Sequence, residues 1–424
     1  MMEANEYSHP LQLGRYRKPT STFGKYDNAR RFWEDHVTGV FLAPHLEKLL
    51  ARCKGRGTGL RILDLGCGVG DGLDLIQRIA RSQGRGLGAA RTKLVPPELL
   101  GEYVGVDIND DLLCQAEECY ASASNVRFVR GDLSEGLPDE IFRDHRPFDL
   151  YFTSYAMLSH FRDDQFLTIL GDVCRHAPGR ALFVGDWLGQ YSYEWPRFWL
   201  DAPRADYFVD YRMSYLYDEV ERRTNEIPSF PLRLMTRDEA LRLVREASEE
   251  SGVPVHPLVT FDRSILTGRH TDTREYNPTS PPLRSAINSL LEPQTRTDLE
   301  QLLVDYVPRQ GFDAVNRFYQ GFFRATNDLV SYTVALLEDP VQADRELPGL
   351  PQPPCLDPSP LTDSMRLMRS LIGGLRSVEW GDARANLIEP ALALALEHME
   401  IELQGGLGMG HSLGVIAEIA KDVD

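Results

Sequence analysis

One short segment constrains the fold of this 424-residue chain more than any other. Residues 61–65 are largely apolar, as in a buried strand, and residues 66–70 read G-C-G-V-G. The segment that follows, to about residue 81, has the apolar spacing of a helix. A strand, a glycine-rich turn and a helix in this order are typical of the start of a β-α-β unit.

The same alternation continues along the chain. Four more strands are expected at 103–107, 126–129, 148–153 and 181–185, with helices at 110–120 and 163–176 between them. Five strands that alternate with helices predict an α/β fold with a doubly wound, parallel, Rossmann-like sheet. Ligands of such sheets bind beyond the carboxyl ends of the strands, so we expect the functional residues in the loops that follow the strands.

Other segments are expected to surround this sheet. A helix over 236–250, with Thr236 and Glu239 as a capping box, and a strand over 256–265 should extend it. Seven prolines between 340 and 360 indicate a connector, and a short helix is expected from Ser412. The predicted division is a helical N-terminal cap at 1–60, the sheet domain at 61–280 with an aromatic-rich insertion at 187–235, a helical cap at 281–340, a proline-rich linker at 341–360 and a helical C-terminal extension at 361–424.

Composition limits the classes of partner. The chain has 46 Lys and Arg against 63 Asp and Glu, a net charge of −17, which disfavours binding to nucleic acid or to anionic membranes. No apolar run approaches the roughly 18 residues of a membrane span, and the N-terminus is polar, so a cytoplasmic protein is expected. The six cysteines lack paired spacing, which predicts reduced thiols and no metal site, while self-association into a homo-oligomer stays open.

The glycine-rich turn also indicates the kind of ligand. A dinucleotide fingerprint, G-x-G-x-x-G, would place its third glycine at Asp71, so the pattern here departs from it. Asp64 stands two residues before the first glycine, where a carboxylate can accept a hydrogen bond from an ammonium group. We therefore expect a ligand that resembles an amino acid at this end. The glycines would also suit a tight turn without a ligand.

Further polar residues stand where the second and third strands end. Asp107 has two oxygens that match two ribose hydroxyls, and Ile108 beside it would pack on an adenine ring. Asp132 can accept from an adenine amino group, with Leu133 as an apolar wall, although a loop or capping acid is the alternative for Asp132. The loop that begins at Thr153 should meet a second substrate.

This ordered set resembles the class I S-adenosylmethionine-dependent methyltransferase superfamily, on the motif L-D-L-G-C-G-x-G at 63–70 together with Asp107 and Asp132. The resemblance is specific over about 61–186, and an insertion at 84–100 departs from it by lengthening the path to Asp107. It implies adenosylmethionine as cofactor, held by Asp64, Gly66, Cys67, Gly68, Asp107, Ile108, Asp132, Leu133, Thr153 and Ser154. Methyl transfer in that family depends largely on proximity and orientation, so a dedicated base is optional.

Candidates for the acceptor end are less specific. The candidate catalytic residues are Tyr155, His160 and Asp186, and the candidate substrate-binding residues are Tyr26, Trp33, Trp187 and Tyr191. His160 is either a general base or a structural residue before a helix. The eleven aromatic residues within 187–217 either form a cage for the acceptor or pack the core of a lid. The polar run 269–276 either reaches the acceptor or is a solvated loop, and the glycine-rich 408–411 segment is interpreted as a turn.

Three hypotheses follow. The first is methyl transfer to an N, O or C nucleophile of a small molecule of specialised metabolism. The second keeps the cofactor but attacks its aminocarboxypropyl carbon, or cyclises or lyses it, which releases methylthioadenosine. The third is a non-catalytic scaffold that binds adenosylmethionine.

Overall fold

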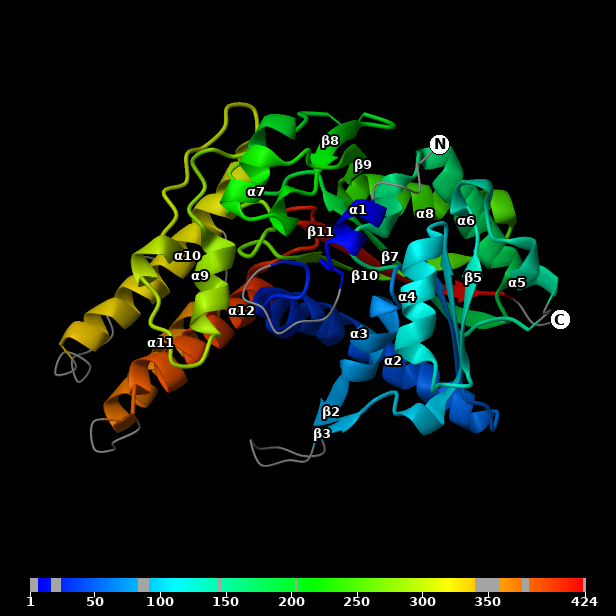
Figure 1. The fold of residues 1–424 in the computed structure, drawn as a ribbon, viewed down its shortest axis with the longest axis horizontal. Helices are drawn as coiled ribbons and strands as arrows, with labels where there is room; N and C mark the ends of the chain where they lie inside the picture. Colours follow the sequence, from blue (N-terminus) through cyan, green and yellow to red (C-terminus); the bar gives the residue numbers. More distant parts are fainter. Residues whose placement is uncertain are drawn as a thin grey trace.

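A central sheet organises the computed structural model, which describes residues 7–16, 24–82, 91–143, 146–202, 204–339, 359–375 and 381–421 (Figure 1). Its main path runs in the order β10-β11-β7-β6-β1-β4-β5. These strands are β1 (Leu60–Leu65), β4 (Leu100–Asp107), β5 (Val126–Arg130), β6 (Leu150–Phe152), β7 (Arg180–Gly189), β10 (Val255–Arg263) and β11 (Ser412–Ala420). The five strands from β5 to β7 are parallel, so the predicted Rossmann-like sheet is confirmed.

Helices cover both faces of this sheet. The larger ones are α2 (Asp35–Gly55), α3 (Asp71–Arg78), α4 (Asp110–Tyr120), α6 (Asp163–His176) and α8 (Arg237–Ser251). Alternate residues of β1 pack in two different apolar clusters, because successive side chains of a strand point to opposite faces of the sheet. Leu60 and Ile62 belong to the cluster that includes α2 and α3, while Leu63 and Leu65 pack with α6 and α8.

The remaining elements before residue 263 are short. The helices and helical turns are α1 (Ser8–Gln12), a π-helical turn (Arg30–Glu34), α5 (Asp139–Arg143), α7 (Glu219–Thr224) and 3₁₀ turns at Pro97–Leu99, Leu133–Glu135, Met157–His160, Pro196–Phe198 and Ser214–Leu216. The strands are the pair β2 (Ala80–Ser82) and β3 (Arg91–Lys93), and the pair β8 (Phe208–Arg212) and β9 (Ser229–Met235). β9 also pairs with the end of β7 and extends the sheet beside the functional loops.

The final strand corrects the sequence prediction. The segment from Ser412, expected to be a helix, is the strand β11, which lies between β7 and β10 and is antiparallel to both. Its apolar run suits either a helix or a buried strand. It forms a strand because it can pair with the edges of both β7 and β10. Gly414 shows how tightly it fits, since a Cβ there would lie 2.3 Å from the ring of Phe261. The predicted extension is therefore helical only before this strand.

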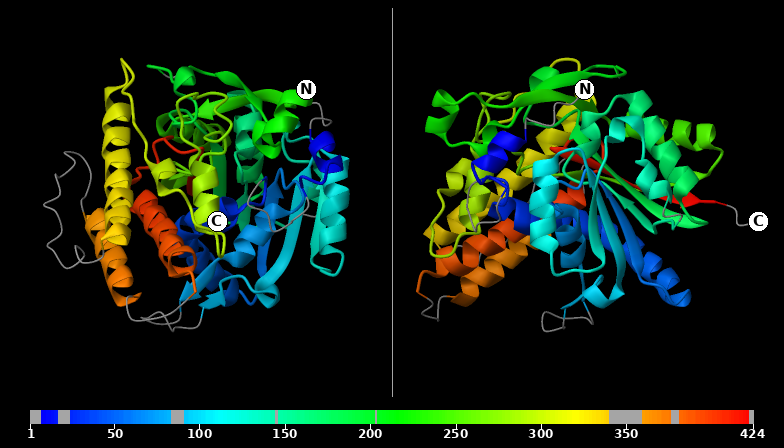
Figure 2. Two further views of the ribbon diagram at one scale, coloured as in Figure 1. Left: turned by 60° about the vertical axis from the view of Figure 1, so that its left-hand side comes forward. Right: turned by 45° about the vertical axis from the view of Figure 1, so that its right-hand side comes forward.

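The helices between β10 and β11 thus form an insertion into the sheet. They are α9 (Leu283–Leu290), α10 (Asp313–Glu338), α11 (Ser359–Gly374) and α12 (Glu389–Leu403), with a 3₁₀ turn at Leu299–Leu302 and a π-helical turn at Arg384–Ile388. Figure 2 shows α10, α11 and α12 packed side by side, on the side of the molecule away from α4 and β5.

Several other sequence predictions are confirmed, including the strand at β10 and the capping box of α8, in which Thr236 and Glu239 bond each other's backbone amides. Most of the proline-rich linker at 341–360, and residues 84–90 of the 84–100 insertion, lie outside the described residues. None of the helices in the described ranges is long and apolar enough to cross a membrane.

Candidate active site

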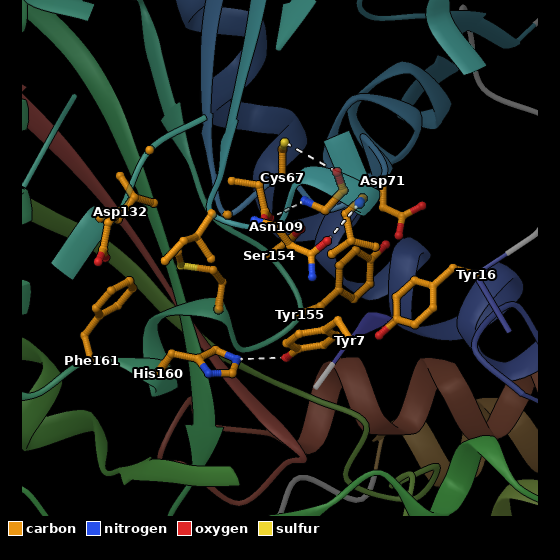
Figure 3. Close-up of a pocket in the computed structure, with 18 of the residues that line it drawn as sticks. Tyr7, Tyr16, Cys67, Asp71, Asn109, Asp132, Ser154, Tyr155, His160 and Phe161 are labelled. Carbon is orange, nitrogen blue, oxygen red and sulfur yellow. Dashed lines mark hydrogen bonds between the residues drawn. The ribbon is translucent and has the colours of Figure 1, made fainter. Parts of the chain in front are cut away.

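A first cavity of about 170 Å³ lies at the carboxyl edge of the parallel strands (Figure 3). It is lined by the loops that follow β1, β4, β5 and β6, and by Tyr7, Tyr16 and Lys25 from the N-terminal segment. Ten residues predicted from the sequence line it, namely Gly66, Cys67, Gly68, Asp107, Ile108, Asp132, Leu133, Ser154, Tyr155 and His160. The structure therefore brings most of the predicted cofactor residues together.

The glycine-rich turn after β1 forms one wall of this cavity. Gly66 and Gly68 have φ of 73° and 53°, in the left-handed region where a side chain is disfavoured. A Cβ on Gly66 would collide with the side chain of Met157, whereas a Cβ on Gly68 would meet nothing within 4 Å. Gly68 lines the cavity, so its lack of a side chain leaves room for a ligand against the backbone.

Asp107, at the end of β4, is held against this turn by main-chain donors. The amide of Gly68 donates to its Oδ2 at 2.8 Å, and the amide of Asn109 donates to its Oδ1 at 2.9 Å. Burial raises the pKa of Asp107, and these amides oppose that shift because they stabilise the charged form. The carboxylate is thus fixed in place on the cavity wall.

The two ends of the first cavity differ in character. Asp132 and Phe161 lie at one end and Asp71 and Tyr16 at the other (Figure 3). Asp132 is exposed and accepts a hydrogen bond from the amide of Ser134 at 2.9 Å, as a capping residue does. At the opposite end, burial and charge dominate.

Asp71 is the buried acid of that opposite end. It forms ion pairs with Lys25 at 2.8 Å and Arg30 at 3.2 Å, and the hydroxyl of Tyr26 donates to it at 3.0 Å. The Lys25 ammonium also lies 4.0 Å from the centre of the Tyr16 ring. Burial lowers the pKa of Lys25 to about 8. A cation and an anion therefore face this end of the cavity together.

Asp64 and Thr153 were predicted to touch the cofactor but do not line the cavity. Both side chains are 1% exposed, because these residues point into the core of the sheet. The hydroxyl of Tyr103 donates to Asp64 at 2.5 Å, and burial raises the pKa of Asp64 to about 7. Thr153 donates to the carbonyl of Val184 at 3.0 Å.

The loop after β6 carries unusual backbone geometry. Tyr155 and Ala156 have φ of 57° and 61°, and left-handed residues other than glycine concentrate at functional sites. The Tyr155 hydroxyl donates to Asp35 at 2.7 Å, and its ring lies near two guanidiniums, at 3.9 Å from Arg30 and 5.1 Å from Arg263. The ring of Tyr155 therefore lines the cavity, while its hydroxyl is already bonded to Asp35.

His160 ends the helical turn that follows this loop. Its Nε2 lies 3.0 Å from the hydroxyl of Tyr7, and its Nδ1 has no hydrogen-bond partner among the described residues. Burial lowers the pKa of His160 to about 4, because the charged imidazolium is poorly solvated there. The imidazole is therefore neutral at pH 7.

A second cavity adjoins the first, and the two share five lining residues: Tyr7, Lys25, Tyr155, His160 and Tyr215. Its other walls come from segments far apart in the sequence, including Arg30, Tyr211, Arg263 and Arg269. Arg269 begins the polar run 269–276, whose first three residues are buried, so the solvated-loop interpretation of this run is wrong at its start.

The remaining predicted residues lie outside both cavities. Asp186 pairs with Arg263 at 2.7 Å, behind the second cavity, and Tyr26 lies behind Asp71. Trp187 packs in the core, its ring 5.2 Å from that of Phe166.

Tyr191 and Trp33 also point elsewhere. The Tyr191 hydroxyl donates to the carbonyl of Leu200 at 3.3 Å, and Trp33 lines a separate cavity beside α2. Most of the aromatic segment 187–217 is therefore packing, because a high density of rings does not reveal which of them face a cavity. Tyr211 and Tyr215 are its members that line the second cavity.

Sequence reasoning missed several lining residues. Asp71 directly follows the glycine-rich turn, so its position at the start of α3 was a usable signal. Tyr7, Tyr16, Lys25 and Arg30 carry no such signal, since they precede the sheet domain and reach the site only through tertiary packing.

Comparison with known proteins identifies part of the chain. Residues 57–177, which include β1, β4, β5, β6 and α6, match the model of a family described as a methyltransferase domain. The chain therefore carries a methyltransferase domain over residues 57–177. S-adenosylmethionine is accordingly the cofactor of this methyltransferase. A comparison with curated proteins finds no match.

Solved structures align with the methyltransferase only loosely. The YcgJ protein of Bacillus subtilis is 15% identical, over 48% of this chain and 66% of its own, with a TM-score of 0.27. An S-adenosylmethionine-dependent methyltransferase of Clostridium acetobutylicum is 13% identical, over 61% and 90%, with a TM-score of 0.33. DesVI of Streptomyces venezuelae is 12% identical, over 60% and 92%, with a TM-score of 0.31. Alignments at this level carry no argument about the acceptor.

Proposed function

We propose that the methyltransferase transfers a methyl group from adenosylmethionine in the first cavity to a small molecule in the second. The observation that carries this proposal is that the two cavities adjoin and share Tyr155 and His160. The walls of the second cavity are largely buried side chains, including Arg30, Tyr211 and Arg263, which favours a small acceptor over a macromolecule. We place this acceptor in specialised metabolism, because its cavity is built largely by segments outside residues 57–177.

The residues of the first cavity suit the cofactor. The space beside Gly68 allows the ligand to approach the backbone, and the fixed carboxylate of Asp107 suits two ribose hydroxyls. Asp132 and Leu133 would hold the adenine. At the other end, Lys25 and Asp71 offer opposite charges for the carboxylate and the ammonium of the cofactor. This gives Asp71 the role that the sequence assigned to Asp64.

His160 is the group we assign to the proton of the acceptor. The cofactor supplies a methyl group that its sulfonium already activates, so the chain needs to orient the nucleophile and accept a proton. The neutral imidazole can do so at Nδ1 when Nε2 carries the hydrogen and donates it to Tyr7. In this arrangement Tyr155 forms a wall, and Asp186 positions Arg263.

Product analysis tests the proposal. The enzyme is incubated with adenosylmethionine and pooled amines, acids and hydroxyl compounds, and the nucleoside products are separated by mass. Adenosylhomocysteine that forms only with acceptor is the expected product. Methylthioadenosine as the enzyme-dependent product would overturn methyl transfer, and its formation without acceptor would indicate cyclisation or lysis of the cofactor.

A further inference from the structure

The charged groups of the second cavity are predominantly cationic. Lys25, Arg30, Arg263 and Arg269 line it, against one carboxylate, Glu34, among the described lining residues. Glu34 is already paired with two guanidiniums, Arg269 at 2.7 Å and Arg284 at 2.7 Å. Burial raises the pKa of Glu34, but these two pairs and Arg263 nearby outweigh burial and hold the pKa well below its usual range. Glu34 is therefore already occupied by cations of the protein.

Arg269 carries a donor that is not engaged by the part of the chain that the structure describes. The residue is 6% exposed, its Nη2 donates to Glu34, and its Nη1 has no hydrogen-bond partner among the described residues. Leaving a buried donor of a charged group unpaired costs free energy, so such a group is suited to a ligand.

Arg284 provides an internal comparison. It belongs to the same ion-pair network but does not line the second cavity. Its Nε and Nη2 donate to Asp27, and its Nη1 donates to Glu34 and to the carbonyl of Thr267, so all three of its nitrogens are engaged. The unpaired donor thus occurs on the guanidinium that faces the cavity.

Aromatic rings form the rest of the wall. The ring of Phe230 lies 5.4 Å from that of Tyr7 and 6.1 Å from that of Tyr211, and the guanidinium of Arg269 lies 5.1 Å from the ring of Tyr215. Rings at such separations offer flat apolar faces to a planar ligand. His160 lines the same cavity, and the centre of its ring lies 5.1 Å from the centre of the Phe230 ring.

We propose that the acceptor is a small aromatic acid, whose carboxylate binds Arg269 Nη1 and whose ring packs among Tyr7, Tyr211 and Phe230. This inference rests on the proposed function, because it names the class of molecule in the acceptor cavity. The anion gains a charge-assisted hydrogen bond, and the donor of Arg269 gains its missing partner.

Isothermal calorimetry on enzyme saturated with adenosylhomocysteine tests this with matched probes. The probes are 2-, 3- and 4-hydroxybenzoate and the three corresponding hydroxybenzamides, which have nearly the same shape without the charge. We expect at least one acid to bind about 10- to 100-fold more tightly than its amide, the range of a hydrogen bond to a charged group. Equal binding within every pair, or no binding of any acid at millimolar concentration, would overturn the inference.

Variants of Arg269 locate the effect. Arg269→Met should abolish the preference for the acid, and Arg269→Lys should restore part of it by restoring the charge. Arg197→Met is the matched control, because Arg197 also lies over a tyrosine ring, at 5.0 Å from Tyr276, but outside the cavity. An acid preference that survives in Arg269→Met would contradict the assignment.

The affinity for adenosylhomocysteine tests the proposed function separately from the aromatic acid. It should be unchanged in all three variants, which also shows that they are folded. Failure of the wild-type enzyme to bind adenosylhomocysteine would reject the proposed function itself. Normal binding of adenosylhomocysteine without an acid preference would reject only the aromatic acid. If Arg269→Met does not fold, Arg269→Lys and the wild-type pairs still decide the question.

Discussion

The two adjoining cavities are built in different ways. The first is made mainly by the loops that follow β1, β4, β5 and β6, and backbone amides and glycines shape its central wall. The second is made mainly by side chains from the N-terminal segment, the loop after β6, β8 and β9 with the turn between them, and residues near the end of β10 and the start of β11. The comparison teaches that a site built from the backbone leaves a motif in the sequence, whereas a site assembled from distant side chains does not.

The largest expected effect tests whether the first cavity depends on its backbone. Gly68→Val places a side chain in the space that Gly68 leaves open, so we expect adenosylhomocysteine to bind about 100- to 1000-fold more weakly by calorimetry. Gly57→Val is the matched control. Gly57 also has a positive φ, 68°, and an added Cβ would meet nothing within 4 Å, but Gly57 lies outside the cavity. Equal losses of affinity in both variants would point to general destabilisation.

A second change separates chemistry from cofactor binding. His160→Ala removes the proposed proton acceptor, so we expect kcat for the identified acceptor to fall about 100-fold, the lower range for general bases. The affinity for adenosylhomocysteine should change little, because the cofactor contacts are assigned to other residues, such as Gly68, Asp107 and Asp71. His256→Ala, at an exposed position on β10, serves as the control in the same assay. Unchanged kcat in His160→Ala would leave His160 with a structural role.

The support for His160 gives a smaller effect. Tyr7→Phe removes the hydroxyl that lies 3.0 Å from Nε2, so we expect kcat to fall about 3- to 10-fold, as for one neutral hydrogen bond. The same change in the His160→Ala background should have no further effect, which a double-mutant cycle measures. Additive losses would show that Tyr7 acts independently of His160.

The smallest effect on binding is expected at Asp64. Because Asp64 lies behind the wall, Asp64→Asn should change the affinity for adenosylhomocysteine less than about 3-fold, which is below 1 kcal/mol. A loss above 10-fold would restore the direct contact with the ammonium that the sequence predicted.

The same variant should change how stability depends on pH. The pKa of Asp64 is about 7 in the folded protein and 3.8 in the unfolded chain. The neutral form of Asp64 therefore stabilises the folded wild type fully below about pH 4, and this contribution is lost as the pH rises to 7. In urea unfolding of the ligand-free proteins, the free energy of unfolding of Asp64→Asn should therefore rise relative to that of the wild type between pH 4 and 7. A pH-independent difference would contradict the raised pKa.

Sequence reasoning succeeded where local chemistry determines structure. The positions of Gly68 and Asp107 follow from a glycine turn and a strand end, and both residues line the first cavity. It failed where the decision is made by packing. The run from Ser412 has the composition of a helix or a strand, and only the vacant position between β7 and β10 makes it β11. Likewise, nothing near Arg269 in the sequence shows that its Nη1 is buried and has no partner within the described ranges.

The place of β11 in the sheet has a consequence for biosynthesis. The strand comes from the last ten or so residues described, yet it pairs with β7 and β10, which a ribosome releases much earlier. Until then the nascent chain carries two unpaired edges, and exposed edges invite pairing with other chains. Completion of the sheet therefore waits until residues 412–420 have been synthesised. Loss of β11 alone would leave the facing edges of β7 and β10 open and the polypeptide prone to aggregation.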